Sequence, residues 1–401
     1  MEKALRKYLE RHAEPEARAI GQSPLHKKVF GHIIVIPAYG EDENLFQTLK
    51  SIPESPLGPV LAIVVVNGSQ DAPAWVHEKN EDMLARLALS PFPQGVFVID
   101  RASPAKRFPE KQGVGLARKI GCDMALALQV RGMLRSRWIH TTDADALLPP
   151  DYFLRAEAVT KADISALLYP FRHRDSEDAS LNEASRLYEL HLQYYVEGLR
   201  WAGSPYAFHT LGSTLALCGS SYAEVGGFPR RMAGEDFYLL NKIAKVGRVE
   251  SLIGDPILLE SRLSDRVPFG TGPAFSQIMA DRAENKPYHL YHPQVFDNLK
   301  LWLSLIEELV EYKHEFNLIG SLKSGTKELK GEPLFEVLSK MEAFEAVADA
   351  VRRSHDPRIL RRHLHTWFDG FRTLKFIHAL RDQAYPSLPW EEALSKAPFM
   401  K

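Results

Sequence analysis

The chain has 401 residues, which is long enough to bury a large core and to form two or three domains. Its composition, 45% hydrophobic and 25% charged, is that of an ordinary globular protein. A formal net charge of −1 provides no overall field that would recruit nucleic acid or an anionic membrane. The two cysteines, Cys122 and Cys218, lack the spacing of a metal site, and so small a number does not suggest a disulfide scaffold.

The N-terminal segment does not resemble an export signal. Residues 1–18 are charged throughout, without the apolar stretch of a secretory signal, and no run in the chain approaches the about 18 apolar residues of a membrane-spanning helix. We therefore expect a cytoplasmic protein that is peripheral to a membrane at most. Residues 1–20 have the apolar spacing of a helix that Pro15 should interrupt near Ala13, and we expect this helix to serve packing or contacts in a homo-oligomer.

Apolar runs alternate with helical patterns through the first part of the chain. Strands are expected at residues 32–36, 60–66, 95–99 and 137–140, and helices at 44–52, 74–88 and 114–130. Short β-branched runs of this kind are typical of strands that are buried on both faces, and Pro37 should stop the first of them. The alternation predicts an α/β fold with a mostly parallel sheet that is flanked by helices.

Polar clusters follow all four of these strands, at residues 37–43, 67–71, 100–111 and 143–145. In parallel sheets of this class, ligands bind outside the carboxyl ends of the strands. The four clusters are therefore expected to converge on one crevice, although they are distant in sequence.

Asp143 and Asp145 are the most informative residues in these clusters. In an extended segment residues i and i+2 project to the same side, so the two carboxylates can reach one point in space. Like charges that close repel each other unless a cation lies between them, and Mg²⁺ or Mn²⁺ suits carboxylate oxygens while leaving positions for water and phosphate. The pair predicts a metal site suited to a nucleotide diphosphate, although such a pair alone is more typical of a solvated turn after a strand.

The second half of the chain adds one acidic pair and one basic loop. A long helix is expected at 177–200 and a strand at 249–259, followed by a polar, glycine-ended loop that holds Arg262 and Arg266. Glu235 and Asp236 open a helix, where carboxylates are favoured by the unpaired N–H groups, so capping is the structural alternative to a catalytic role. The remainder forms a helical C-terminal region, with helices expected at 298–316, 332–353 and 357–381.

Five blocks in this order, spread over residues 33–247, resemble the GT-A-fold nucleotide-sugar glycosyltransferases, and most closely family 2. They are IPAYGEDENLFQTLKSI, VVVNGSQD, KQGVGLARKIG, DADALLP, and the acceptor-half pair EVGGFP and GEDFYLL. The resemblance implies a Rossmann-like GT-A domain with four parts. These are a helical segment at 1–28, a nucleotide-sugar-binding half at 29–147, an acceptor-binding half at 148–275 and the helical region at 276–401.

The resemblance also implies roles for the residues that match the family's motifs. The nucleotide-binding positions are Pro37, Ala38, Tyr39, Glu41, Asn67, Asp71, Lys111, Arg118 and Asp143. Among them, the first four would line the base and ribose pocket, and the two cations would face the base or the diphosphate. Asp145 would coordinate the metal directly, with Asp143 near the ribose or a metal-bound water.

Three further roles complete the implied site. Asp236 matches the family's general base and has Glu235 beside it, because an acceptor hydroxyl needs a carboxylate to take its proton. Retaining relatives use a histidine as third metal ligand, for which His289 is our choice over His209 and His292. Arg262 and Arg266 would bind an acceptor phosphate or carboxylate, or cover the diphosphate, unless they are solvated loop residues.

The implied function is metal-dependent transfer of one sugar from a nucleotide-diphosphate donor to the hydroxyl of a small soluble acceptor, with inversion. UDP is expected in preference to GDP, although Asn67 stands where the family usually carries an aspartate that recognises uracil. One alternative is a retaining transferase that acts on a phosphorylated small acceptor. Others are a nucleotidyltransferase, whose glycine-rich phosphate loop is missing after the first strand, and a non-catalytic protein that binds sugar nucleotides or serves as a scaffold.

Overall fold

The computed structural model describes residues 2–90, 92, 95–263, 270–312 and 332–400. The chain divides into two compact units, Met1–Asn182 with Thr210–Ala274 and Glu183–His209 with Phe275–Lys401. Residues 183–209, which the sequence analysis placed in the acceptor-binding half, thus group with the C-terminal helices. The two units are described separately below.

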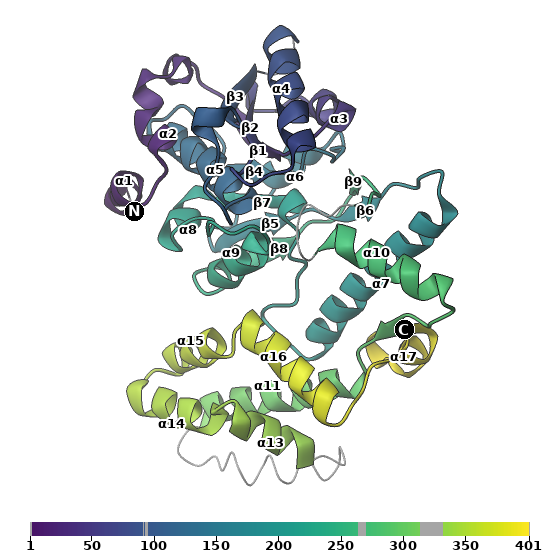
Figure 1. The fold of residues 1–401 in the computed structure, drawn as a ribbon. Helices are drawn as coiled ribbons and strands as arrows, with labels where there is room; N and C mark the ends of the chain where they lie inside the picture. Colours follow the sequence, from purple (N-terminus) through teal and green to yellow (C-terminus); the bar gives the residue numbers. More distant parts are fainter. Residues whose placement is uncertain (1, 91, 93–94, 264–269, 313–331, 401) are drawn as a thin grey trace. The chain divides into compact units, whose positions relative to one another are not determined.

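The first unit contains a seven-stranded sheet with the strand order β3-β2-β1-β4-β7-β5-β8 (Figure 1). β7 runs antiparallel to β4 and β5, and the other neighbouring pairs are parallel. The strands are β1 (His32–Ala38), β2 (Val60–Asn67), β3 (Gly95–Arg101), β4 (Trp138–Thr141), β5 (Ile164–Leu168), β7 (Leu215–Cys218) and β8 (Arg248–Ser251). The predicted α/β class with a mostly parallel sheet is confirmed.

A second, two-stranded sheet lies in the same unit, where β6 (Phe171–His173) pairs in parallel with β9 (Ile257–Leu259). The sequence predicted one strand over 249–259, and this is wrong. The segment instead forms β8 and β9, which are separated by a turn in which Gly254 has a φ of 134°. Only glycine adopts such a backbone angle easily, so the chain changes direction here.

Pro37 does not stop β1, contrary to the prediction. Proline has no backbone N–H to donate, and no neighbouring strand needs that hydrogen bond at this position. The carbonyl of Val35 accepts the N–H of Thr142, so the backbone groups of residue 35 point toward β4. Two residues later Pro37 has the same orientation. The pairing of β1 with β4 ends at Val35, whereas β1 continues along β2 as far as Ala38.

Helices cover both faces of the sheet, because alternate side chains of the buried strands point to opposite sides. Ile34, Ile36 and Val64 pack against helices on one face, and these helices include α3 (Glu43–Ser51), α4 (Ala74–Leu89) and α6 (Tyr152–Glu157). On the other face α5 (Val114–Val130) approaches so closely that a Cβ on Gly121 would lie 2.3 Å from the side chain of Val35. Two shorter helices, α8 (Gly219–Glu224) and α9 (Glu235–Ile243), complete the unit.

The N-terminal segment is fixed to α5 by a buried polar network. The predicted break is confirmed, since α1 (Glu2–Arg11) ends before Pro15 and α2 (Pro15–Arg18) begins there. The hydroxyl of Tyr8 donates to Asp123 Oδ1 at 2.7 Å, and Lys119 Nζ donates to the same hydroxyl at 2.7 Å. Lys119 and Asp123 form a buried ion pair at 2.9 Å, and its hydrogen bonds with Tyr8 hold α1 in position.

In its described residues the second unit is helical apart from the pairing of β10 (His289–Leu290) with β11 (Leu388–Pro389). Its core surrounds Trp302 and Phe296. The helices are α7 (Ala179–Trp201, from Glu183 onward), α10 (Thr271–Ala283, from Phe275 onward), α11 (Gln294–Tyr312), α13 (Glu332–Lys340), α14 (Ala343–Arg353), α15 (Pro357–Trp367), α16 (Gly370–Gln383) and α17 (Trp390–Lys396).

Each of the two long C-terminal helices that the sequence predicted is in fact a pair of helices. Glu342, with a left-handed φ of 56°, separates α13 from α14. Asp369 caps α16 by accepting the N–H of Arg372, which ends the continuity with α15. Within the described part of the chain, no helix is both long enough and apolar enough to span a membrane.

Candidate functional site

The ends of β1 and β2 are joined by a buried asparagine pair. Asn67 Nδ2 donates to the carbonyl of Ala38 at 2.9 Å, Asn80 Nδ2 donates to the carbonyl of Asn67 at 2.9 Å, and the N–H of Gly40 donates to Asn80 Oδ1 at 2.9 Å. Asn67 is almost completely buried, so its amide group holds the turn after β1 in place. A contact between this side chain and a nucleotide base stays a prediction.

The loops after β2 and β3 lie side by side, as the convergence argument predicted. The N–H of Gln70 donates to the carbonyl of Phe108 at 3.0 Å, and the N–H of Phe108 donates to the carbonyl of Gly68 at 2.9 Å. Asp71 and Lys111 are exposed on these loops, and Lys111 has a left-handed φ of 62°. Both predicted nucleotide-binding residues are thus accessible at the same edge of the sheet.

The segment that carries Asp143 and Asp145 turns where the sequence analysis expected it to be extended. Asp143 lies two residues after the end of β4, Ala144 and Asp145 form a turn, and the N–H of Ala146 donates to the carbonyl of Asp143 at 3.4 Å. The side chain of Asp143 is 42% exposed and that of Asp145 is 15% exposed. Asp143 and Asp145 therefore do not lie in one extended segment, and each carboxylate contacts a different arginine.

Arg118 connects the turn after β4 to the acidic pair on α9. Its Nη1 donates to Glu235 Oε1 at 2.7 Å, and its Nη2 donates to Asp143 Oδ1. The residue is buried on α5 and lies between the two carboxylates. Arg118 thus brings Asp143 and Glu235 together, and a contact between Arg118 and the nucleotide stays a prediction.

Glu235 and Asp236 occupy the first turn of α9. The N-cap position belongs to Gly234, so neither carboxylate is the capping residue, although Asp236 Oδ1 accepts the N–H of Phe237 at 2.7 Å. Burial raises the pKa of Glu235 to about 7, against the lowering effect of Arg118. Burial also raises the pKa of Asp236, again opposed by Arg118. A raised pKa makes each carboxylate a stronger base.

Gly212 is a site residue that the sequence analysis missed. Its N–H donates to Asp236 Oδ2 at 2.8 Å, and it lies just before β7, whose first residues adjoin the end of β4. A Cβ at this position would lie 2.4 Å from Arg118 Nη2, so only glycine leaves space for the guanidinium. The only local signal was a cluster of small residues before an apolar strand.

Arg262 lies directly in the site and is not a solvated loop residue. Its Nη1 and Nη2 donate to the two carboxylate oxygens of Glu41 at 2.9 and 3.1 Å, and its Nη2 lies 2.8 Å from Asp145 Oδ2. The contact joins the turn after β1 to the turn after β4. Arg266, the other predicted cation of this loop, lies outside the described residues.

Five carboxylates and two guanidinium groups therefore meet at this edge of the first unit, which leaves three formal negative charges among the described side chains. Oxygen donors and excess negative charge fit Mg²⁺ or Mn²⁺. Within the described residues no three His, Cys, Asp or Glu side chains could hold a metal by themselves. This fits an ion held by one or two carboxylates that a bound phosphate completes.

The candidate histidine ligands all belong to the second unit. His289 is exposed on β10, and His292 Nδ1 accepts the N–H of Gln294 at 3.1 Å. A role for His289 as third metal ligand stays a prediction.

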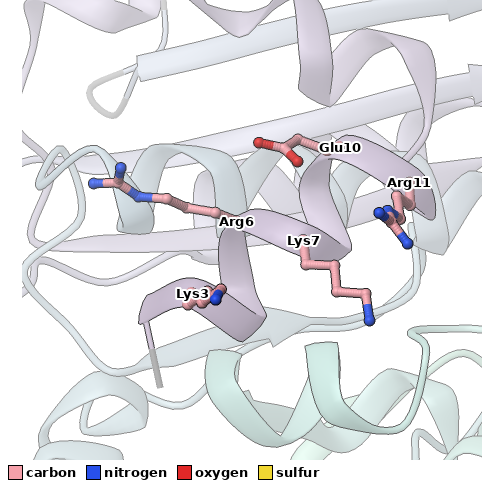
Figure 2. Close-up of a pocket in the computed structure, with 5 residues that line it drawn as sticks. All are labelled: Lys3, Arg6, Lys7, Glu10 and Arg11. Carbon is pink, nitrogen blue, oxygen red and sulfur yellow. The ribbon is translucent and has the colours of Figure 1, made fainter.

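A cavity of about 550 Å³ is found on α1, where it is lined by Lys3, Arg6, Lys7, Glu10 and Arg11 (Figure 2). It shares no residue with the acidic site, and the polar network of Tyr8 gives α1 a sufficient structural role. We assign no function to this cavity.

No family model matches the sequence, and no curated protein matches it. Among solved structures the chain is similar to the mannosyltransferase PcManGT from Pyrobaculum calidifontis in complex with GDP-Man and Mn²⁺. That similarity has 16% identity and a TM-score of 0.37, and it covers 91% of this chain and 94% of that one.

Two further structures are similar at the same level. TarS from S. aureus has 12% identity and a TM-score of 0.37 over 84% of this chain, which spans only 55% of TarS. Glucosyl-3-phosphoglycerate synthase from Mycobacterium tuberculosis, in complex with Mn²⁺, UDP and glucosyl-3-phosphoglycerate, has 15% identity and a TM-score of 0.37. Its match covers 68% of this chain and 88% of that one. Identities and TM-scores this low assign the chain to no family, so the function is argued from the site.

Proposed function

We propose that the protein is a metal-dependent glycosyltransferase of the GT-A type, which moves one sugar from a nucleotide-diphosphate donor to an acceptor hydroxyl. One observation carries this proposal. Arg118 joins Asp143, at the carboxyl end of β4, to Glu235, which stands beside Asp236 on α9. The metal-type aspartates and the candidate base thus belong to one site, as a displacement between a diphosphate and a hydroxyl requires.

The donor binds at the carboxyl ends of β1 to β4. Tyr39 and the backbone around Asn67 border the base and ribose, and Asp71 and Lys111 are accessible on the adjoining loops. Lys111 is a cation for the diphosphate. A bound Mg²⁺ or Mn²⁺, held by Asp145 and Asp143, supplies charge that offsets the negative charge developing on the leaving diphosphate.

The acceptor hydroxyl is deprotonated by Asp236. Backbone N–H groups of Gly212 and Phe237 fix this carboxylate, one at each oxygen, and each oxygen keeps a further lone pair for a proton. Burial raises the pKa of Asp236 and strengthens it as a base. Glu235 is tied to Arg118, so it orients the pair and does not compete for the hydroxyl.

The finer assignments are UDP in preference to GDP as the nucleotide, a small soluble acceptor, and inversion at the sugar carbon. Inversion follows if Asp236 and the leaving diphosphate lie on opposite faces of the sugar, because a single in-line displacement then forms the new bond as the old one breaks. A small acceptor is supported by the missing Q-x-x-R-W signature of processive synthases.

Calorimetric titration of UDP, GDP and ADP, each with and without Mn²⁺, tests the proposal. Wild type is expected to bind UDP most tightly and only weakly without the metal, and Asp145→Ala should lose the metal dependence. Asp151→Ala is the matched control, since Asp151 lies on the same connection after β4 but pairs with Arg155 at 3.1 Å, and it should bind as wild type does. Failure of every nucleotide to bind in a metal-dependent way would refute the proposal.

A further inference from the structure

We propose that Arg262 is a resident counter-cation of the donor site, which a divalent metal ion must displace from Asp145. The metal then binds tightly only together with a nucleotide diphosphate. This inference rests on the proposed function, and it adds an order of events and a residue that enforces it.

The geometry shows one cation shared by two carboxylates, one from the turn after β1 and one from the turn after β4. The guanidinium of Arg262 forms a two-pronged contact with Glu41, whose side chain is nearly buried, and reaches Asp145 Oδ2 at 2.8 Å through Nη2. Forked contacts of this kind between arginine and carboxylate are stronger and more directional than a simple charge pair. The guanidinium therefore occupies the position between Glu41 and Asp145 that another cation would otherwise take.

The backbone that leads to Arg262 is anchored at two points, Leu258 and Ser261. Leu147, two residues after Asp145, pairs with Leu258 of β9, with N–H to carbonyl distances of 2.8 and 3.0 Å. The hydroxyl of Ser261 donates to the carbonyl of Arg174 at 2.6 Å, and Ser261 is buried. The arginine thus reaches the site from a fixed segment, and a chance surface contact does not explain it.

A metal ion at this carboxylate oxygen would compete with the guanidinium. Mg²⁺ binds oxygen at about 2.1 Å and Nη2 lies 2.8 Å from the same oxygen, so the two cations would repel each other. Metal binding at Asp145 Oδ2 therefore favours release of Arg262 from it. Without a nucleotide the released guanidinium loses its contact with Asp145 and gains no other, and this loss weakens metal binding.

A bound diphosphate compensates for the contact that Arg262 loses. Its oxygens complete the metal's coordination and offer the guanidinium a new anionic partner with suitable geometry. Metal and nucleotide then favour each other's binding, and thermodynamic linkage makes the effect reciprocal. Arg262 in this view is a positioning residue that couples the two ligands.

Mn²⁺ affinity, measured by electron paramagnetic resonance of the free ion with and without UDP, tests the coupling. In wild type UDP should raise the Mn²⁺ affinity substantially, within the about 5- to 150-fold range of typical coupled sites. Arg262→Gln should bind Mn²⁺ about tenfold more tightly than wild type without UDP, because the ion no longer competes with the Arg262 guanidinium for Asp145, and should show correspondingly weaker coupling. Arg262→Lys, which keeps the charge but not the fork, should fall between the two.

Arg174→Gln is the matched control. Arg174 pairs with Glu260 on the same anchored segment, its side chain is 27% exposed against 28% for Arg262, and it has no described contact with Glu41 or Asp145. This variant should bind Mn²⁺ as wild type does, and denaturant unfolding verifies that each variant is folded.

Two other outcomes would overturn the inference. If wild type and Arg262→Gln have the same Mn²⁺ affinity and the same response to UDP, Arg262 does not couple the ligands, while metal-dependent nucleotide binding still supports the proposed function. If neither protein binds Mn²⁺ or UDP under any of these conditions, the proposed function is overturned together with the inference.

Discussion

Two arginines hold the acidic edge of the sheet, and water reaches them to different extents. The Arg118 centre consists of Arg118, Asp143 and Glu235, and its guanidinium side chain is 3% exposed. The Arg262 centre consists of Arg262, Glu41 and Asp145, and its arginine side chain is 28% exposed. Each guanidinium lies between two carboxylates, and each centre takes one aspartate from the same turn after β4.

Because of this difference in burial, we expect Arg118 to be a fixed structural cation and Arg262 to be exchangeable. An arginine without access to water cannot leave its partners without a large loss, because Glu235 would remain as an uncompensated buried charge. A partly exposed arginine loses less when a ligand replaces it, since water can hydrate the released guanidinium. The Arg118 centre should therefore set the geometry of the site, and the Arg262 centre should respond to ligands.

Replacing the buried arginine should give the largest effect on stability. We expect Arg118→Met to lower the free energy of unfolding by about 3–5 kcal/mol at pH 8, because it leaves Glu235 buried without its cation. The loss should shrink at pH 5, where Glu235 can take up a proton instead. Urea denaturation at the two pH values measures both quantities, and an equal loss at pH 5 and pH 8 would show that the ion pair is not its cause.

Glu235→Gln should change how the stability of the protein depends on pH. The pKa of Glu235 is raised to about 7 in the folded protein from an ordinary value of 4.5, so the folded state binds a proton more tightly than the unfolded state does. Its contribution to stability is full below pH 4.5 and is lost as the pH rises through about 7. The variant cannot ionise here, so it should gain stability relative to wild type across that window. Parallel pH profiles of the two proteins would contradict the assignment.

Substitution in the Arg262 centre should lower stability least. We expect Arg262→Gln to lower the free energy of unfolding by only about 1 kcal/mol, because the new amide can still donate a hydrogen bond to Glu41. Urea denaturation at pH 8, beside Arg118→Met, gives the comparison directly. A loss as large as that of the buried arginine would mean that Arg262 is a fixed structural element as well.

The sequence reveals most of what lies on buried elements of the first unit. A strand covered on both faces must be apolar throughout, so β1, β2 and β4 are visible as short β-branched or apolar runs, and the prediction of α5 over 114–130 matches its observed bounds. The rule that parallel strands end at one edge then locates the site before any contact is known.

The contacts within the site are not visible in the same way. Arg262 and Glu41 are 221 residues apart, and no periodicity connects a loop arginine to one carboxylate among many. The turn at Ala144, which separates the two aspartates into different centres, is followed by the pairing of Leu147 with Leu258, a contact between segments distant in sequence. The space that Gly212 leaves for Arg118 is likewise a tertiary property.

The most direct test of the account is the release of UDP from a panel of UDP-sugars, with small hydroxyl acceptors and Mn²⁺, by wild type and by Asp236→Asn. Wild type should release UDP, and the variant should release it about 10²- to 10⁴-fold more slowly, because a general base contributes rate enhancement of that order. Its affinity for UDP should stay within about twofold, since no ground-state contact with the nucleotide is lost. Release by Asp236→Asn at the wild-type rate would contradict the central claim that this edge of the sheet is a catalytic site with Asp236 as its base.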